Sequence, residues 1–163
     1  MKFLLKDNIS IIKKVKVERK KIVFTNGCFD LLHVGHIRYL AQAKKLGDFL
    51  IIGLNSDSSV KALKGKDRPI NSFEDRAILF SALTSVDLVV IFEEQTPANL
   101  IKDIVPDILV KGGDYNIEDI VGYHTVIQNG GKVKTLSFHD GYSSTNYINK
   151  INKRWLAYPN KFK

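Results

Sequence analysis

Residues 22–36 read IVFTNGCFDLLHVGH, and this stretch decides the fold. Its first four residues are β-branched or aromatic, a composition typical of a buried strand. The strand pattern stops at Asn26-Gly27, and two histidines three positions apart then flank a glycine where a helical pattern begins. A strand, a polar loop and a helix in this order predict the first unit of a parallel α/β sheet.

The same alternation of strand and helix patterns continues along the chain. The later strand patterns are rich in apolar residues and show little alternation, which indicates burial on both faces of a sheet. The expected strands are 22–25, 49–52, 88–92, 108–110 and 133–136, and the expected helices are 37–46, 73–83, 97–105, 117–129 and 144–153. The expected helix N-caps are Ser72, paired with Asp75, and Thr96, followed by Pro97 as first helical residue. The prediction is a doubly wound, Rossmann-like α/β fold: a five-stranded parallel sheet with helices on both faces.

The length of 163 residues predicts a single domain, residues 1–163, with basic flanks at 1–21 and 150–163. The net charge of +8 comes from these flanks, because the first holds 8 Lys/Arg against 2 Asp/Glu and the second 5 against none. The central body carries 12 basic and 15 acidic residues. Terminal charge runs are usually solvated, so we expect no nucleic-acid partner. A basic nucleic-acid-binding module remains the alternative from a different functional class.

The chain has one cysteine and no apolar run near the roughly 20 residues that a membrane span needs. We therefore expect a cytoplasmic protein with no membrane partner and no disulfide. The segment 64–71, with a glycine, a proline and four charges, is the most loop-like interior stretch. Apolar residues near both ends predict that the termini pack on each other or form a homodimer. They are Ile9, Ile11, Ile12, Val15, Trp155, Leu156 and Tyr158.

Chemistry is expected where the strands end, because ligands of doubly wound sheets bind beyond the carboxyl ends. Gly35 permits close backbone approach, and His36 lies near a helix N-terminus, which favours an anion. His33 and His36 could therefore face one phosphate, or a histidine here could be a structural hydrogen-bonding group. A metal site of Cys28, His33, His36 and Asp30 matches no standard zinc spacing, so we expect no protein-held metal. Neither a G-x-G-x-x-G fingerprint nor a Walker A sequence is present.

Residues 27–36 resemble the G-x-F-D-x-x-H-x-G-H signature of the cytidylyltransferase-like nucleotidyltransferases. Over residues 8–152 the chain closely resembles the adenylyltransferase domain of bifunctional heptose-phosphate enzymes that make ADP-heptose. The segments that carry this likeness are 24–30, 55–57, 63–65, 68–69, 74–76, 92–94, 96–97 and 109–115. The resemblance implies a stand-alone enzyme that transfers AMP from ATP to D-glycero-D-manno-heptose 1-phosphate, for lipopolysaccharide or another surface glycan. A cytidylyltransferase acting on glycerol phosphate or another alcohol or sugar phosphate is the alternative.

The resemblance also implies roles for individual residues. The implied catalytic residues are His33, His36 and Lys64. The implied nucleotide-binding residues are Gly27, Cys28, Phe29, His33, Gly35, His36, Lys111, Gly112, Asp114, Ser143, Ser144 and Thr145. The implied sugar-phosphate-binding residues are Asp30, Arg68, Arg76 and Lys111. Mg²⁺ is expected to bind mainly through the ATP phosphates.

Three of these assignments have alternatives. Arg76 could equally be a structural ion-pair partner, and Asp114 is a candidate for the ribose or for the metal. Family members usually have Ser-Thr-Thr where this chain has Ser143-Ser144-Thr145, at the end of the segment 140–145. The change keeps a hydroxyl at every position, so anion binding is still expected there, and Ser143 can also cap the last helix.

Overall fold

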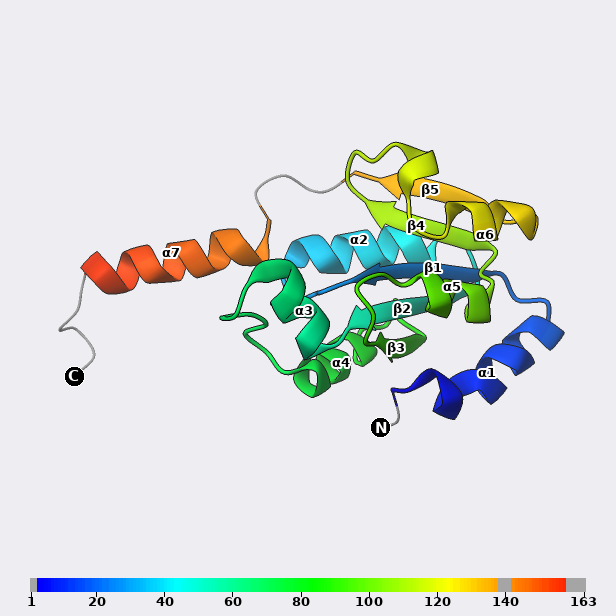
Figure 1. Cartoon of the computed structure of the whole chain (residues 1–163), viewed down its shortest axis with the longest axis horizontal. Helices are drawn as coiled ribbons and strands as arrows, with labels where there is room; N and C mark the ends of the chain where they lie inside the picture. Colours follow the sequence, from blue (N-terminus) through cyan, green and yellow to red (C-terminus); the bar gives the residue numbers. More distant parts are fainter. Residues whose placement is uncertain (1–2, 138–141, 158–163) are drawn as a thin grey trace.

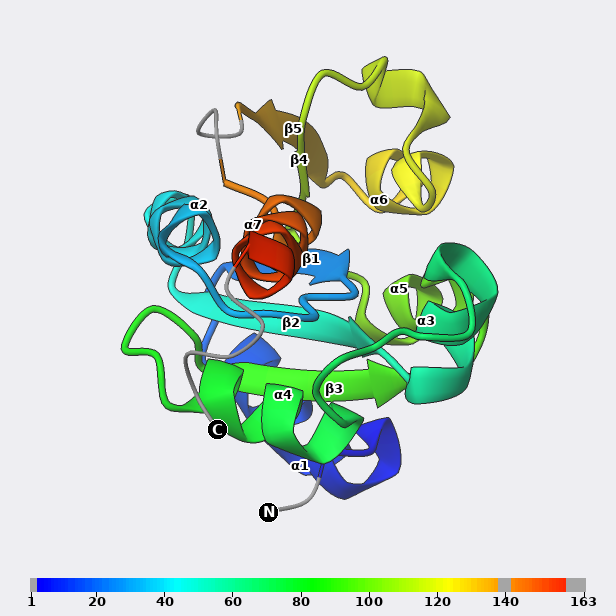
Figure 2. The same cartoon turned by 90° about the vertical axis from the view of Figure 1, so that its left-hand side faces the viewer.

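The computed structural model describes residues 3–137 and 142–157. Its centre is a five-stranded, all-parallel sheet with the strand order β3-β2-β1-β4-β5 (Figures 1 and 2). The strands are β1 (Ile22–Gly27), β2 (Phe49–Asn55), β3 (Leu88–Phe92), β4 (Ile108–Gly112) and β5 (Lys132–Leu136). All five predicted strands are confirmed, and β1, β2 and β4 extend further toward their carboxyl ends than the apolar pattern indicated; β1 includes Asn26 and Gly27, where the strand was expected to stop.

Helices cover both faces of this sheet, as predicted. The helices are α1 (Leu5–Val17), α2 (Val34–Lys44), α3 (Asp57–Lys64), α4 (Phe73–Ser81), α5 (Ala98–Ile104), α6 (Tyr123–Gln128) and α7 (Ser144–Ala157), with a short 3-10 turn, η1 (Ile117–Asp119). One buried cluster joins α2 and α4 to the sheet through Leu40, Ala43 and Phe80. The opposite cluster joins α1, α5 and α6 to it, with Ile12 and Ile101 among its members.

The N-terminal segment differs from the solvated flank that its charge suggested. Ile12 and Val15 are buried in the core, so α1 is a packed element of the domain, on which Lys13, Lys14 and Lys16 are exposed. The backbone of Phe3 also accepts a hydrogen bond from Ile91 N–H on the edge strand β3, at 2.9 Å. Burial of a few apolar side chains therefore outweighs the charge of the segment, because the lysines need not leave water.

Three local predictions were wrong. The expected helix 117–129 is interrupted, because Gly122 adopts a left-handed conformation (φ +93°) where an added Cβ would lie 2.6 Å from Ile101.

Pro97 is the N-cap of α5, so the helix begins one residue later than expected and Thr96 does not cap it. The sequence interpretation also missed α3, whose N-cap Ser56 accepts a hydrogen bond from Ser59 N–H. By contrast, Ser72 caps α4 with Asp75 as predicted.

The strand order places the topological switch between β1 and β4. From β1 the chain continues on one side through β2 and β3, and from β4 it continues on the other side to β5. The loops that leave β1 and β4 consequently diverge, and they leave a crevice at their carboxyl ends. In the described part of the chain, no helix is long and apolar enough to cross a membrane.

Candidate active site

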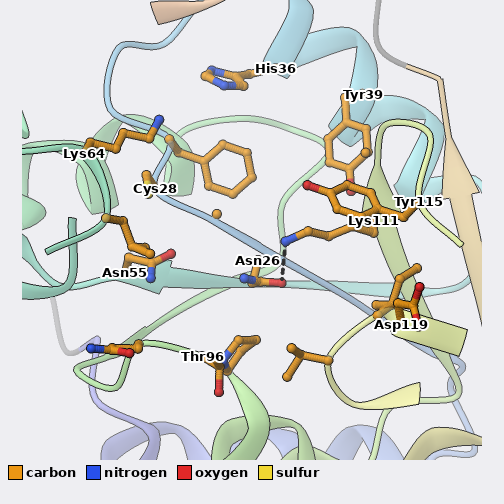
Figure 3. A pocket seen from close by; sticks show the side chains of 18 residues that line it. Asn26, Cys28, His36, Tyr39, Asn55, Lys64, Thr96, Lys111, Tyr115 and Asp119 are labelled. Atoms are coloured by element: carbon orange, nitrogen blue, oxygen red, sulfur yellow. Dashed lines mark hydrogen bonds between the residues drawn. The ribbon is translucent and has the colours of Figure 1, made fainter. Parts of the chain in front are cut away.

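A cavity of about 580 Å³ lies at this crevice (Figure 3). It is lined by residues at or just after the carboxyl ends of β1, β2, β3 and β4, together with residues of α2, α3 and the turn around η1. The lining residues are Asn26, Gly27, Cys28, Phe29, His36, Tyr39, Asn55, Leu63, Lys64, Gln95, Thr96, Pro97, Lys111, Gly112, Tyr115, Asp119, Ile120 and Val121. Side chains from all the central strands therefore meet at the edge where the sequence predicted a ligand.

His33 has a defined tautomer because it caps α2. Its Nδ1 accepts a hydrogen bond from the backbone N–H of His36 at 3.3 Å. A ring nitrogen that accepts carries no proton, so neutral His33 holds its proton on Nε2. Burial lowers the pKa of His33, which favours this neutral form. Gly35 makes the arrangement possible, since a Cβ there would lie 3.0 Å from His33 Nδ1.

His36 stacks on His33, with ring centroids 3.6 Å apart and 18° between the planes. Burial lowers the pKa of His36 to about 3, and the charges of His33 and Lys64 add to the effect. The imidazole is therefore neutral at physiological pH and can donate a hydrogen bond to an anion without carrying a charge of its own. Such a donor is preorganised, because stacking already fixes its ring.

Phe29 supports the His36 ring from another side. The two rings meet edge to face with centroids 5.1 Å apart, and Phe29 also packs on Phe80 of α4. Phe29 has a left-handed backbone (φ +45°), which costs a non-glycine residue about 1–2 kcal/mol. The surrounding contacts must hold this conformation, and the orientation of the ring depends on it.

Two lysines supply positive charge to the cavity. Lys111, at the end of β4, is partly buried, and its Nζ donates a hydrogen bond to Asn26 Oδ1 at 3.3 Å. Burial lowers the pKa of Lys111. Lys64 is the last residue of α3 and is exposed. All three of His36, Lys64 and Lys111 line the cavity, and Figure 3 shows Lys64 and His36 near one end of it and Lys111 extending into it from another direction.

Asp30 does not face the cavity. Its side chain is fully buried and forms an ion pair with Arg68. It also accepts hydrogen bonds from the backbone N–H groups of Ile70, at 2.7 Å, and Asn71, at 3.4 Å. Asp30 thus fastens the loop 65–72 to the signature segment. Sugar-phosphate binding by Asp30 and Arg68 stays a prediction, and the contacts in the structure are with protein groups.

Arg76 of α4 is likewise fully buried. Its guanidinium donates to the carbonyls of Cys28, at 2.6 Å, and Asn71, at 3.1 Å, and to Asp57 Oδ1, at 2.7 Å. These contacts agree with the structural ion-pair alternative from the sequence. They leave Arg76 beneath the signature loop, with protein partners on Nε and on both terminal nitrogens.

The predicted site near the last helix lies beside the cavity. Ser143 caps α7 by accepting a hydrogen bond from Asn146 N–H, and buried Ser144 exchanges hydrogen bonds with the backbone of Leu31. Ser143, Ser144, Thr145 and Asp114 are not among the lining residues of the cavity. Of the segment 140–145, Asp140 and Gly141 lie outside the described residues.

Sequence reasoning assigned no binding role to several lining residues. Asn26 and Asn55 lie at the carboxyl ends of β1 and β2, and Thr96 follows β3, so the rule on carboxyl ends could have identified them. Tyr115 ends the segment 109–115 that resembles the family, whereas the residues 119–121 come from the crossover after β4, where no motif indicates a ligand contact. Tyr39 lines the cavity from α2, and its hydroxyl lies 2.7 Å from that of Thr25 in a buried pair. Burial raises the pKa of Tyr39 to about 12, so its hydroxyl stays protonated.

The family model described as Cytidylyltransferase-like matches residues 24–150. Among curated proteins, the chain is 58% identical over 135 residues to "Bifunctional protein HldE" of Proteus mirabilis, covering 83% of this chain and 28% of that protein. It is 51% identical over 145 residues to the protein of the same name from Geobacter sulfurreducens, covering 89% of this chain and 30% of that one. The chain thus spans less than a third of the length of these relatives.

Among solved structures, the "lipopolysaccharide core biosynthesis protein" of Thermoplasma volcanium is 30% identical, with a TM-score of 0.62. The match covers 76% of this chain and 99% of that one. A pantoate-beta-alanine ligase from Francisella tularensis, 17% identical with a TM-score of 0.59, shares the fold; the match covers 95% of this chain and 77% of that one. The family match spans most of this chain and includes the signature loop, His36 and Lys111. The chain is therefore a nucleotidyltransferase that belongs to the cytidylyltransferase-like family.

Proposed function

We propose that this protein transfers AMP from ATP to D-glycero-D-manno-heptose 1-phosphate, releasing pyrophosphate and forming ADP-heptose for lipopolysaccharide or another surface glycan. Two comparisons support this choice of substrates. The relatives named HldE are more than 50% identical to the chain, and a solved relative is described as a lipopolysaccharide core biosynthesis protein. The proposal also places the protein in the cytoplasm, where ATP is available.

One observation carries the proposal: a neutral, partly buried histidine and two lysines face one cavity at the switch point. Nucleotidyl transfer to a phosphate needs little covalent chemistry from the protein, because an ionised sugar phosphate is already a nucleophile. The protein must align this phosphate with the α-phosphorus of ATP and stabilise the charge that develops in the transition state. No general base is required for this step.

The side chains divide this work as follows. His36 donates a hydrogen bond to the phosphate under attack, and His33 can donate its Nε2 proton to the same triphosphate. Lys111 and Lys64 add positive charge from two sides. The partial burial of Lys111 strengthens its interaction with a phosphate, because water screens it less. Pyrophosphate then leaves with its charge partly neutralised.

Mg²⁺ fits this site as a companion of ATP. Among the described residues, no group of three His, Cys, Asp or Glu side chains is placed to hold a metal ion. Asp119 is the carboxylate among the described lining residues, and Mg²⁺ commonly binds through one or two carboxylates plus substrate phosphates. When bound, the ion would neutralise charge on the phosphates.

The test is a matrix of nucleoside triphosphates and acceptors, with pyrophosphate release as the measurement. The matrix contains ATP and CTP, each with heptose 1-phosphate and with glycerol phosphate. We expect turnover with ATP and heptose 1-phosphate, and dependence on Mg²⁺. Turnover with CTP and glycerol phosphate alone would overturn the proposal in favour of a cytidylyltransferase. Steeply salt-dependent oligonucleotide binding without turnover would instead favour the nucleic-acid-binding alternative.

A further inference from the structure

The buried guanidinium of Arg76 touches the signature loop next to Phe29, whose ring contacts His36. The carbonyl of Cys28, which accepts its shortest hydrogen bond at 2.6 Å, belongs to the peptide that precedes Phe29. Phe29 is the residue with the left-handed backbone, and it is one of three non-glycine residues with positive φ in the described chain. Arg76 therefore binds directly beside the strained residue.

The strained residue in turn supports the catalytic imidazole. The Phe29 ring meets the His36 ring edge to face at 5.1 Å, and Phe80 of α4 contacts both rings, at 4.8 Å from Phe29 and 5.8 Å from His36. Rotation of the Cys28–Phe29 peptide would move the Phe29 ring and remove part of the wall that buries His36. The contacts form a chain from Arg76 to Cys28, Phe29 and His36.

The other two partners of Arg76 place it where three segments meet. Its Nε binds the carbonyl of Asn71, at the end of the loop that Asp30 fastens, and its Nη2 binds Asp57 at the start of α3, the helix that ends in Lys64. A lysine could satisfy one of these groups but not three in fixed directions, because only a guanidinium presents a planar set of donors.

We propose that Arg76 is a positioning residue, which sets the orientation of His36 by holding the Cys28–Phe29 peptide and does not itself touch the substrate. Its effect on turnover rests on the proposed function, whereas its effect on the His36 ring can be measured without substrate. The proposed function and the proposed role of Arg76 can therefore be refuted separately.

The experiment compares the wild type with Arg76→Lys and with the matched control Asp57→Asn. Asp57→Asn removes the charge of the Nη2 partner, whose side chain is 36% exposed, and leaves both carbonyl contacts intact. For each folded variant, NMR titration of the imidazole gives the pKa of His36, and steady-state kinetics give kcat and both KM values.

In Arg76→Lys we expect the pKa of His36 to rise from about 3 toward the 6.5 of a free imidazole. We also expect kcat to fall by about a hundredfold, with little change in either KM. Asp57→Asn should stay within about twofold of the wild type in kcat, because the amide keeps an oxygen that accepts from Arg76 Nη2 and both carbonyl contacts of the guanidinium remain. An unchanged pKa of His36, equal effects of both variants, or a rise in the sugar-phosphate KM with normal kcat would overturn the proposal.

If Arg76→Lys does not fold, an amide-to-ester replacement between Cys28 and Phe29 decides the question. The replacement keeps every side chain and weakens the carbonyl that Arg76 binds at 2.6 Å. We expect the pKa of His36 to rise in the protein with the ester bond too. An unchanged pKa would contradict the proposed coupling between Arg76 and His36. Absence of turnover in the wild type with every substrate pair would refute the proposed function, and the NMR titration would then decide the role of Arg76 by itself.

Discussion

The neutral state of His36 makes the stability of the protein depend on pH in a defined window. Burial lowers the pKa of His36 to about 3 in the folded protein, against 6.5 for the ordinary imidazole. The unfolded chain therefore takes up a proton below about pH 6.5, whereas the folded protein does so only near pH 3. Stability from this group is fully present above pH 6.5 and is lost as the pH falls through the window.

At pH 5 the expected loss from His36 is about 2 kcal/mol, because the pH lies 1.5 units below 6.5 and each unit corresponds to about 1.36 kcal/mol. This loss of stability is an upper value, since His36 keeps some exposure to water. Urea unfolding of the wild type and of His36→Asn at pH 7.5 and pH 5 isolates the effect, because most other titrating groups are common to both proteins.

The wild type should lose about 2 kcal/mol more than His36→Asn between these two pH values. Equal losses in the two proteins would refute the assignment of a partly buried, neutral His36. A direct NMR titration of His36 without substrate is the second check, and a midpoint near 6.5 would contradict the same reasoning.

Three further predictions concern the frame of the site and the assembly of the chain. Asp30→Asn removes a fully buried carboxylate and leaves the Arg68 side chain, which is 13% exposed, without its ion-pair partner, so urea unfolding should show a loss of about 3 kcal/mol, and a loss below 1 kcal/mol would contradict this role. Gly35→Ala forces a Cβ to within 3.0 Å of His33 Nδ1, so kcat should fall at least about tenfold, and a wild-type kcat would show that the capping geometry is unimportant. Helix α7 projects from the body (Figure 1) and exposes 53% of Ile151. Light scattering should therefore give twice the 18.4 kDa mass for the wild type and a monomer for Ile151→Glu, and a monomeric wild type would end the dimer hypothesis.

The strands could be predicted because their signal is local. Runs such as 88–92 and 108–110 are apolar at every position, and such runs form buried strands in most folds that alternate strands with helices. Short helices gave a weaker signal. The helix α3 has eight residues, and only Val60 and Ser59 are buried in it. Its sequence therefore has no apolar stripe from which a helix could be predicted. The break at Gly122 depends on a contact with Ile101, which no local pattern contains.

The site could be located but not fully assigned. The histidines, Gly35 and Lys111 were predicted because the strand ends and the signature motif identify them. Asp30, Arg68 and Arg76 are charged residues near the site in sequence, which made phosphate binding a reasonable interpretation. In the structure Arg68 pairs with Asp30 and Arg76 with Asp57, and their remaining partners are backbone groups of Cys28 and the segment 70–71. The sequence carries no sign of which groups will be adjacent after folding.

Pyrophosphate release by the wild type and by His36→Ala, with ATP, Mg²⁺ and heptose 1-phosphate, tests the central claim most directly. We predict turnover by the wild type and a fall in kcat of at least about a hundredfold in a folded His36→Ala, as expected for loss of a donor that acts on the transition state. A His36→Ala variant with near-normal kcat, or a wild type that releases no pyrophosphate from this substrate pair, would contradict the claim.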